Sequence, residues 1–439
     1  MVRWKQVTLL GVTFTIIWLL YSQNSATKPQ CSQFPKNVLK YTKTWQIQKT
    51  QHGTLQLMSA FLDDRQKSGL FSKQYPTIRI LGMLDNTNPQ KFYCQIWYDK
   101  EDVAVVESSH FWIWNGDWEQ AETFFQPFVF SCDTPDERIP KYVSLVANKC
   151  DLATNRLTVV YEKVSTKEDF VVCVKGLNFP HDDISIRLVE WIELVTLLGA
   201  TKIHFYKFSV HSNVQKVLDY YENQNRIAIT PLTLVGNYSN TPDFQAKFLH
   251  EHKVERRLQE VLPFNDCLYT YLYKYKYIVS LDIDEVIVPK AGNWSDLMTY
   301  LHARNGLADS YLARNIYFFD HLVHSVGDIP GYMHILTHVT RAEEFSPEGD
   351  YVKGFHDTER VLALYNHISL WCSGWWGCEN LNIGVDLAQM QHYRSDCVKE
   401  LRNCEELKRR TVVDTRVWRF KQKLIPRVET ALIDLYFIG

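Results

Sequence analysis

Residues 277–289 read Tyr-Ile-Val-Ser-Leu-Asp-Ile-Asp-Glu-Val-Ile-Val-Pro, and this stretch decides both the fold and the candidate site. Three carboxylates, at Asp282, Asp284 and Glu285, interrupt a run that is otherwise mostly apolar and rich in β-branched side chains. Such a run predicts a buried strand. Because an unpaired carboxylate is costly to bury, something must compensate the negative charge where this strand ends.

A divalent cation is the compensation that the spacing favours. Residues two apart on a strand face the same side, so Asp282 and Asp284 are expected to approach one ion while Ile283 packs away from it. Carboxylate oxygens suit a hard cation such as Mg²⁺ or Mn²⁺. In open α/β sheets, ligands also bind beyond the carboxyl ends of the strands. The alternative is that the two aspartates only cap the strand end or pair with lysine and arginine side chains.

The chain around this motif alternates between strands and helices from about Asp169 onward. That pattern is typical of a mainly parallel sheet whose faces are covered by helices. The predicted strands are 170–174, 202–208, 227–230 and 277–281, and the predicted helices are 185–198 (ending at Gly199), 214–221 and 244–261 (stopped by Pro263). We therefore expect an α/β main domain over residues 166–439.

The preceding segment is rich in short β-type runs separated by Asn, Asp and Pro turns. Strands are predicted at 78–81, 92–98, 103–106 and 157–161. These runs predict a small antiparallel accessory domain over residues 61–165.

The N-terminus has the features of a membrane anchor. Arg3 and Lys5 precede an uncharged stretch that is just long enough to span a bilayer. Positive residues on that side favour a cytoplasmic N-terminus. A cleaved signal peptide is the alternative, because the apolar centre is short. The expected order is a cytoplasmic tail at 1–5, a signal-anchor transmembrane helix at 6–27 and a polar stem at 28–60.

Composition disfavours one class of partner and leaves room for another. The 439 residues include 48 basic and 50 acidic side chains, and this near-neutral balance disfavours a nucleic-acid partner. Aromatic residues are abundant, with 13 Trp, 24 Tyr and 23 Phe, and such rings stack on sugars as well as filling cores.

Ten cysteines fit an oxidising compartment once export is granted. Three pairs are candidate disulfides by their spacing: Cys372 with Cys378, Cys397 with Cys404, and Cys132 with Cys150. Export would also make two glycosylation sequons reachable, at Asn237 and Asn293.

Seven segments carry, in this order, a resemblance to a known family: CVKG at 173–176, RLVEWIEL at 187–194, LGATKI at 198–203, CLY at 267–269, LDIDEVIVP at 281–289, RVLALYNH at 360–367 and HYR at 392–394. Together they resemble glycosyltransferase family 92. The resemblance implies a catalytic domain of the GT-A fold in which Asp282 and Asp284 hold Mn²⁺ or Mg²⁺ across the phosphates of a UDP-sugar donor. A metal there stabilises the departing diphosphate.

The same resemblance implies transfer of a hexose, with UDP-galactose as the expected donor and with inversion, onto a glycan of a glycoprotein or glycolipid, such as a fucosylated N-glycan core. It also implies a Golgi type II membrane protein whose catalytic domain is luminal. Enzymes of the GT-A fold often add a late histidine to the metal shell. His392 is our first candidate for that ligand and His367 the second.

Inverting transfer needs a carboxylate that deprotonates the acceptor hydroxyl. We assign Glu379 as this general base, because WWGCEN at 375–380 is similar to an acidic tryptophan-glycine segment of other galactosyltransferases, although Asn380 replaces the expected Asp. Glu343, Glu344 and Asp357 are competing candidates, and a solvated surface position is the alternative for each.

Further side chains are candidates for contacts with the substrate. Trp371, Trp375 and Trp376 could form a platform for a sugar or pack in the core. Lys175 and Arg187 could meet uracil or phosphate, or form surface salt bridges.

Two other classes of protein are compatible with the sequence. One is a catalytically inactive, lectin-like glycan-binding protein of the same fold. The other is an exported hydrolase that uses Asp284 and Glu285 as its acid and base. Glycosidases place two carboxylates across the scissile bond, and adjacent residues on a strand point to opposite sides, which disfavours the hydrolase.

Overall fold

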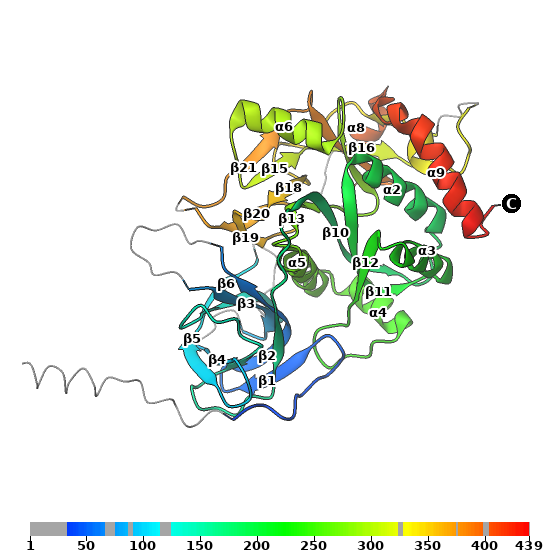
Figure 1. The fold of residues 1–439 in the computed structure, drawn as a ribbon. Helices are drawn as coiled ribbons and strands as arrows, with labels where there is room; N and C mark the ends of the chain where they lie inside the picture. The colour runs from blue at the N-terminus through cyan, green and yellow to red at the C-terminus, as the bar shows by residue number, and fades with distance from the viewer. Residues whose placement is uncertain are drawn as a thin grey trace, which may run out of the picture.

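The computed structural model describes residues 33–65, 75–86, 91–114, 124–323, 328–374, 376–397 and 404–438, which form a mixed α/β protein. A β-rich N-terminal part lies beside a larger part in which helices cover sheets (Figure 1). Within the described ranges, no helix is both long enough and apolar enough to cross a membrane. The predicted tail and signal anchor, residues 1–27, lie outside these ranges.

The N-terminal part is one nine-stranded sheet with the order β5-β4-β8-β9-β2-β3-β7-β6, to which β1 is added beside β2. Its strands are β1 (Gln46–Thr50), β2 (Gly53–Asp63), β3 (Thr77–Leu84), β4 (Tyr93–Trp97), β5 (Val103–Glu107), β6 (Ser109–Trp112), β7 (Gln126–Asp133), β8 (Tyr142–Val146) and β9 (Leu157–Val160). A disulfide between Cys94 and Cys132 joins β4 to β7, which are not neighbours in the sheet, so the sheet curls around its apolar core. The strands predicted from sequence in this region are confirmed as β3, β4, β5 and β9.

Two expectations for this region are wrong. The predicted stem, 28–60, contains β1 and most of β2. Its polar composition concealed them because Gln48 and Gln56 are themselves buried, with their side-chain oxygens accepting main-chain N–H groups of Thr154 and Gly236. Cys132 pairs with Cys94 and not with Cys150, which is also disulfide-bonded.

The larger part is built on a seven-stranded sheet with the order β12-β11-β10-β13-β18-β15-β21. Its strands are β10 (Glu168–Phe179), β11 (Ala200–Val210), β12 (Ile227–Pro231), β13 (Tyr275–Ser280), β15 (Ser310–Ala313), β18 (Lys353–Asp357) and β21 (Asn380–Ile383). The first four strands in that order run parallel. The chain passes from β10 to β11 and β12 on one side and then returns to place β13 on the other side of β10. The strand order therefore reverses between β10 and β13.

Helices cover both faces of the parallel strands, because the side chains of β10 are apolar on both faces. Val172 and Val174 belong to the core shared with α2 (Ser185–Leu198) and α3 (Ser212–Asn223), whereas Val171 and Cys173 pack against α5 (Lys253–Thr270). Because alternate residues enter opposite cores, the strand is apolar on both sides. A disulfide between Cys173 and Cys267 fixes β10 to α5.

The predicted helices differ in how well they match the structure. Residues 185–198 form α2, which ends at Gly199 with φ of 129°, a conformation that favours glycine. The predicted helix 244–261 is two helices, α4 (Pro242–Glu251) and α5, which meet at His252. Pro263 lies inside α5 and does not end it. The buried apolar residues around Pro263 hold the helix on the sheet in spite of the lost hydrogen bond.

A second, five-stranded sheet has the order β14-β22-β16-β17-β23. It comprises β14 (Glu285–Pro289), β16 (Asn315–Phe319), β17 (Thr340–Ala342), β22 (Ala388–Arg394) and β23 (Thr411–Val413), and the remaining elements are α6 (Trp294–Asn305), α7 (His334–Thr337), the hairpin of β19 (Val361–Leu364) and β20 (Ser369–Cys372), α8 (Cys404–Arg409), η2 (Arg416–Phe420) and α9 (Lys421–Asp434). The stretch 277–289 is therefore two strands in different sheets, joined by a turn, and the predicted strand 277–281 corresponds to β13.

Helix α5 connects the N-terminal sheet to the rest of the protein. Its Leu258, Leu262 and Tyr269 share a core with Phe61 and Val129 of the N-terminal sheet. The opposite side of the helix faces the candidate site described next.

Candidate active site

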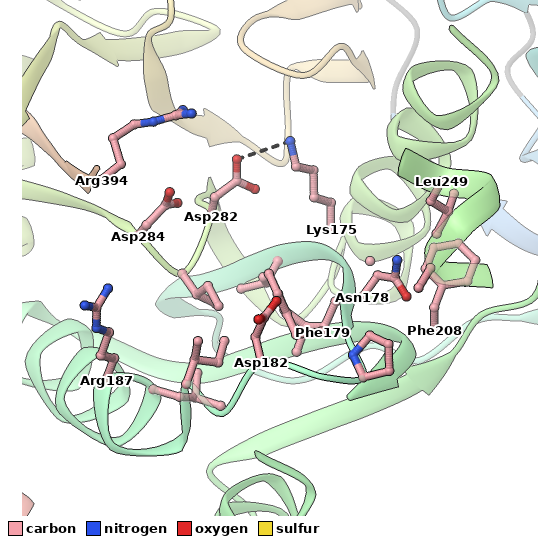
Figure 2. A pocket seen from close by; sticks show the side chains of 18 of the residues that line it. Lys175, Asn178, Phe179, Asp182, Arg187, Phe208, Leu249, Asp282, Asp284 and Arg394 are labelled. Carbon is pink, nitrogen blue, oxygen red and sulfur yellow. Dashed lines mark ion pairs between the residues drawn. The ribbon is translucent and has the colours of Figure 1, made fainter. Parts of the chain in front are cut away.

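A cavity of about 640 Å³ opens at the carboxyl ends of β10 and β13, where the strand order reverses. This is the position at which doubly wound sheets bind their ligands. Its wall includes the residues that follow β10, the turn after β13, part of α5 and the end of β22 (Figure 2). A volume of this size suits a ligand of several rings.

Asp282 and Asp284 both line this cavity from the turn between β13 and β14. The main-chain N–H of Asp282 donates to Glu285 Oε2 at 2.9 Å, and the N–H of Glu285 donates back to the carbonyl oxygen of Asp282 at 3.0 Å. The buried Glu285 thus fixes the turn from behind. The turn, and not a strand face as expected, brings the two aspartates to one cavity.

Two lysines contact the carboxylate of Asp282. Lys175 Nζ lies 3.1 Å and Lys353 Nζ 3.2 Å from Asp282 Oδ2, and Lys353 also lies 3.1 Å from Glu285 Oε2. Burial alone raises the pKa of Asp282, but the two lysines outweigh burial and hold the pKa far below its usual range. Asp282 is therefore ionised at any physiological pH.

Asp284 is the more open carboxylate and has a different partner. Its Oδ2 lies 3.3 Å from His392 Nε2, and 43% of its side chain is exposed. The strands hold this geometry, because Glu285 pairs with His392 in the ladder of β14 and β22 and the N–H of Tyr393 donates to the Asp284 carbonyl at 2.8 Å. Burial raises the pKa of Asp284, but the charges of His392 and Arg394 bring it below its usual value.

The side chains at this end of the cavity fit a hard divalent cation. Neighbouring ligands of an octahedral ion lie roughly 3 Å apart, given bonds of about 2.1 Å. The oxygen of Asp284, which lines the cavity, and the nitrogen of His392, which is buried behind the cavity wall, already have such a spacing. Asp282 lies on the same turn, but its Oδ2 contacts two lysines, and Asp282, Asp284 and His392 do not bring three ligand atoms within 4.8 Å of one another. Asp284 and His392, with Asp282, are the residues that would hold the ion.

Three clusters in the described ranges do bring three metal-ligand atoms close together, but each has its ligand groups engaged elsewhere. Two of them contain cysteines already joined as Cys372–Cys378 and Cys397–Cys404. These two disulfides confirm the expected local pairs. The third is Asp320 with His334 and His338, in which both ring nitrogens of His338 contact carbonyl oxygens, of His334 at 2.6 Å and of Asp320 at 3.0 Å. That histidine has no nitrogen left for a metal.

The structure places Glu379 outside the wall of the cavity, and its assignment as general base stays a prediction. Strand β15 pairs its last residue, Ala313, with Lys353, which touches Asp282. The main-chain carbonyl of Glu379 accepts the N–H of Ser310, the first residue of β15. Ser310 and Ala313 are roughly 10 Å apart along the strand. It is exposed and does not line the cavity.

The competing acidic residues lie elsewhere too. Glu343 and Glu344 are exposed and pair with Arg410. Asp357 pairs with Tyr277 at the start of β13, whereas Asp282 follows the end of that strand. For the hydrolase alternative, Glu285 is buried against Lys353 and does not line the cavity.

The remaining candidates are distributed over the molecule. His367 does not line the cavity. Its Nδ1 bonds to the Val352 carbonyl, and burial with the nearby lysines lowers its pKa to about 3. Trp371 and Trp376 are exposed, and Trp375 lies outside the described residues. Among these remaining candidates, Lys175 and Arg187 do line the cavity. Arg187 Nη1 lies 3.5 Å from Asp320 Oδ2. Of the sequons, Asn237 is exposed in a loop, and Asn293 caps α6.

Three charged residues of the site were not predicted: Lys353, Glu260 and Arg394. Lys353 is a lone lysine in a buried strand, which sequence alone does not connect to Asp282. Arg394 could have been found, because it lies two residues after His392 on the same strand and so faces the same side.

Comparison with known proteins assigns the chain to a class of enzyme, the glycosyltransferases. Residues 168–428, more than half of the chain, match glycosyltransferase family 92, and the chain belongs to that family. The resemblance drawn from the sequence segments is thereby confirmed. Members of this class use a nucleotide sugar and a glycan acceptor.

One curated relative is a β-1,4-galactosyltransferase, galt-1, of Caenorhabditis elegans, 28% identical over 246 residues. The match covers 53% of this chain and 50% of the relative, so the chain spans about half the length of that protein.

Two solved structures give only weak overlaps. A putative glucose-1-phosphate thymidylyltransferase from Bacillus anthracis has a TM-score of 0.22 at 8% identity, covering 44% of this chain and 72% of its own. A nucleoside-diphosphate-sugar pyrophosphorylase from Vibrio cholerae has a TM-score of 0.20 at 11% identity, covering 51% and 91%. Scores this low carry no argument about this chain.

Proposed function

We propose that this glycosyltransferase is a metal-dependent enzyme of the GT-A fold that transfers galactose from UDP-galactose, with inversion, to a glycan of a glycoprotein or glycolipid. The observation that carries the proposal is that Asp282 and Asp284 open into one cavity at the point where the order of the parallel strands reverses. The name of the nematode relative supports galactose as the sugar.

The side chains of the cavity suit the departure of a nucleoside diphosphate. Mn²⁺ or Mg²⁺, when bound, would neutralise the charge that develops on the diphosphate as the glycosidic bond breaks. Asp284 and His392 lie where they would bind that ion, and the lysines keep Asp282 ionised. With Glu379 placed elsewhere, the proposal names no general base.

We place this enzyme in the Golgi membrane as a single-pass type II protein with a luminal catalytic domain. The disulfides support an oxidising compartment, since the described residues include no free cysteine. The anchor at 6–27 stays a prediction from sequence.

A donor panel tests the proposed function against an inactive glycan-binding protein of the same fold. The purified full chain is incubated with UDP-galactose, UDP-glucose, UDP-N-acetylglucosamine and GDP-mannose, with Mn²⁺ or with chelator, and nucleotide release is measured. Release from UDP-galactose above the other donors, and only with metal, is expected. A lack of release from all four donors, together with retained glycan binding, would favour the inactive protein.

A further inference from the structure

Two cationic side chains face the cavity from opposite ends of the Asp282–Asp284 turn. Lys175 extends from β10 on one side, and Arg394, the last residue of β22, lies on the other side, nearest Asp284 (Figure 2). Neither residue has a role in holding the cation described above.

Lys175 is held loosely between two carboxylates. Its Nζ lies 3.1 Å from Asp282 and 3.5 Å from Glu260 of α5, and 15% of its side chain is exposed. Glu260 has a second and closer partner, Arg257 at 2.7 Å. Lys353, by contrast, is 1% exposed and does not line the cavity. Of the two lysines on Asp282, Lys175 is therefore the one that a ligand can reach.

Arg394 is unusual because part of its guanidinium has no partner. Its Nε is buried, yet it lacks a hydrogen-bond partner among the described residues. That nitrogen is itself covered, so a ligand would meet the guanidinium through the part of Arg394 that lines the cavity. The planar guanidinium matches the geometry of a phosphate group.

The apolar end of the cavity gives the ligand a direction. Phe208 and Leu249 line the cavity beyond Lys175, on the side away from Arg394 (Figure 2). A nucleobase would pack against such apolar side chains. A nucleoside diphosphate with its base there would place its first phosphate near Lys175 and its second near Arg394.

We propose that Lys175 and Arg394 form the diphosphate subsite, with Lys175 binding the phosphate nearest the nucleoside and Arg394 the phosphate nearest the sugar. This inference rests on the proposed function. The two cations offset the repulsion between the phosphates and the aspartates, so part of the nucleotide affinity is independent of the divalent ion.

Calorimetric titration with uridine, UMP and UDP in the presence of chelator separates the two contacts. The purified full chain is compared with Lys175→Met and Arg394→Met, whose side chains keep an apolar stem, and with Arg138→Met, an exposed position of the N-terminal part. Lys175→Met is expected to lower the affinity for both UMP and UDP by on the order of 10-fold or more. Arg394→Met is expected to weaken UDP by a similar factor and to leave UMP within about twofold, with Arg394→Lys in between. Arg138→Met should change nothing.

The outcomes separate the subsite from the proposed function. Unchanged UDP affinity in either variant would overturn the subsite, and so would an equal loss for uridine, because that would mean a general structural defect. Failure of the wild type to bind UDP without metal, while Mn²⁺ restores binding, would overturn the subsite and leave the proposed function intact. Failure of the wild type to bind UDP even with Mn²⁺ would contradict the proposed function itself.

Discussion

The ammonium group of Lys353 lies 3.2 Å from the carboxylate of Asp282, with only 1% of the lysine side chain exposed. The same ammonium neutralises Glu285, so one buried cation supports the whole turn that presents the aspartates. Burial lowers the pKa of Lys353, but the two carboxylates outweigh burial and raise it above its usual value. The turn therefore depends on a charge that never titrates under physiological conditions.

Lys353→Met tests this dependence. Removing the cation leaves the buried Glu285 without its closest cation and leaves Asp282 with Lys175 alone, and breaking a buried pair in this way typically costs roughly 3–5 kcal/mol. A loss of that order is expected in the free energy of unfolding measured in urea. Lys421→Met is the control, because the exposed pair of Lys421 with Asp328 should contribute less than about 1 kcal/mol. Equal effects of the two substitutions would show that the buried pair has no special role.

The two aspartates should differ in how they bind the cation. Asp284→Asn and His392→Ala are expected to weaken Mn²⁺ binding at least about 10-fold, because they remove the pair already spaced for one ion. Asp282→Asn should have a smaller effect, because its Oδ2 contacts two lysines. Titration of free Mn²⁺ by electron paramagnetic resonance measures both effects without a substrate. Unaltered Mn²⁺ affinity in Asp284→Asn would contradict this assignment.

The buried Glu190 of α2 should make the stability of the folded protein depend on pH. Burial raises its pKa to about 7, although its carboxylate accepts the main-chain N–H groups of Ile335 and Leu336. The raised pKa means that the stabilising contribution is complete below the unfolded value near 4.5 and declines as pH rises through 7. Thermal melts at pH 5 and pH 7.5 should therefore show the wild type losing stability relative to Glu190→Gln. If the melting temperatures of the wild type and Glu190→Gln differ by the same amount at both pH values, titration of Glu190 does not contribute to stability.

The two sequons should respond differently to substitution. Asn237 is exposed, so Asn237→Gln is expected to remove a glycan from the protein expressed through the secretory pathway without changing its stability. The Asn293 side chain forms a capping box with Asp296, so Asn293→Gln should also cost about 1 kcal/mol. Gel mobility with and without glycosidase, together with thermal melts of the deglycosylated proteins, separates the two effects. Equal stability of both variants would contradict the capping role.

Much of the fold was predictable, because the strongest signals are local. Helix α2 was found with its bounds, and the strands of the parallel sheet were found by their apolar runs. Strands β1 and β2 were missed, because their buried glutamines gain partners only from distant segments. The sequence was sufficient to bring Asp282, Asp284 and His392 together as candidates, and the structure places both aspartates at one cavity and His392 beside Asp284. Lys353 and the true position of Glu379 depend on the order of strands that are far apart in sequence, which no local pattern contains.

Metal-dependent sugar transfer through the paired aspartates is tested most directly by nucleotide release from UDP-galactose with Mn²⁺. The full chain is compared with the double variant Asp282→Asn, Asp284→Asn and with Glu137→Gln, an exposed carboxylate of the N-terminal part. The wild type and Glu137→Gln should release UDP at the same rate. The rate of release by the double variant should be at least about 100-fold lower. Release by the double variant at the wild-type rate would contradict the role of these aspartates.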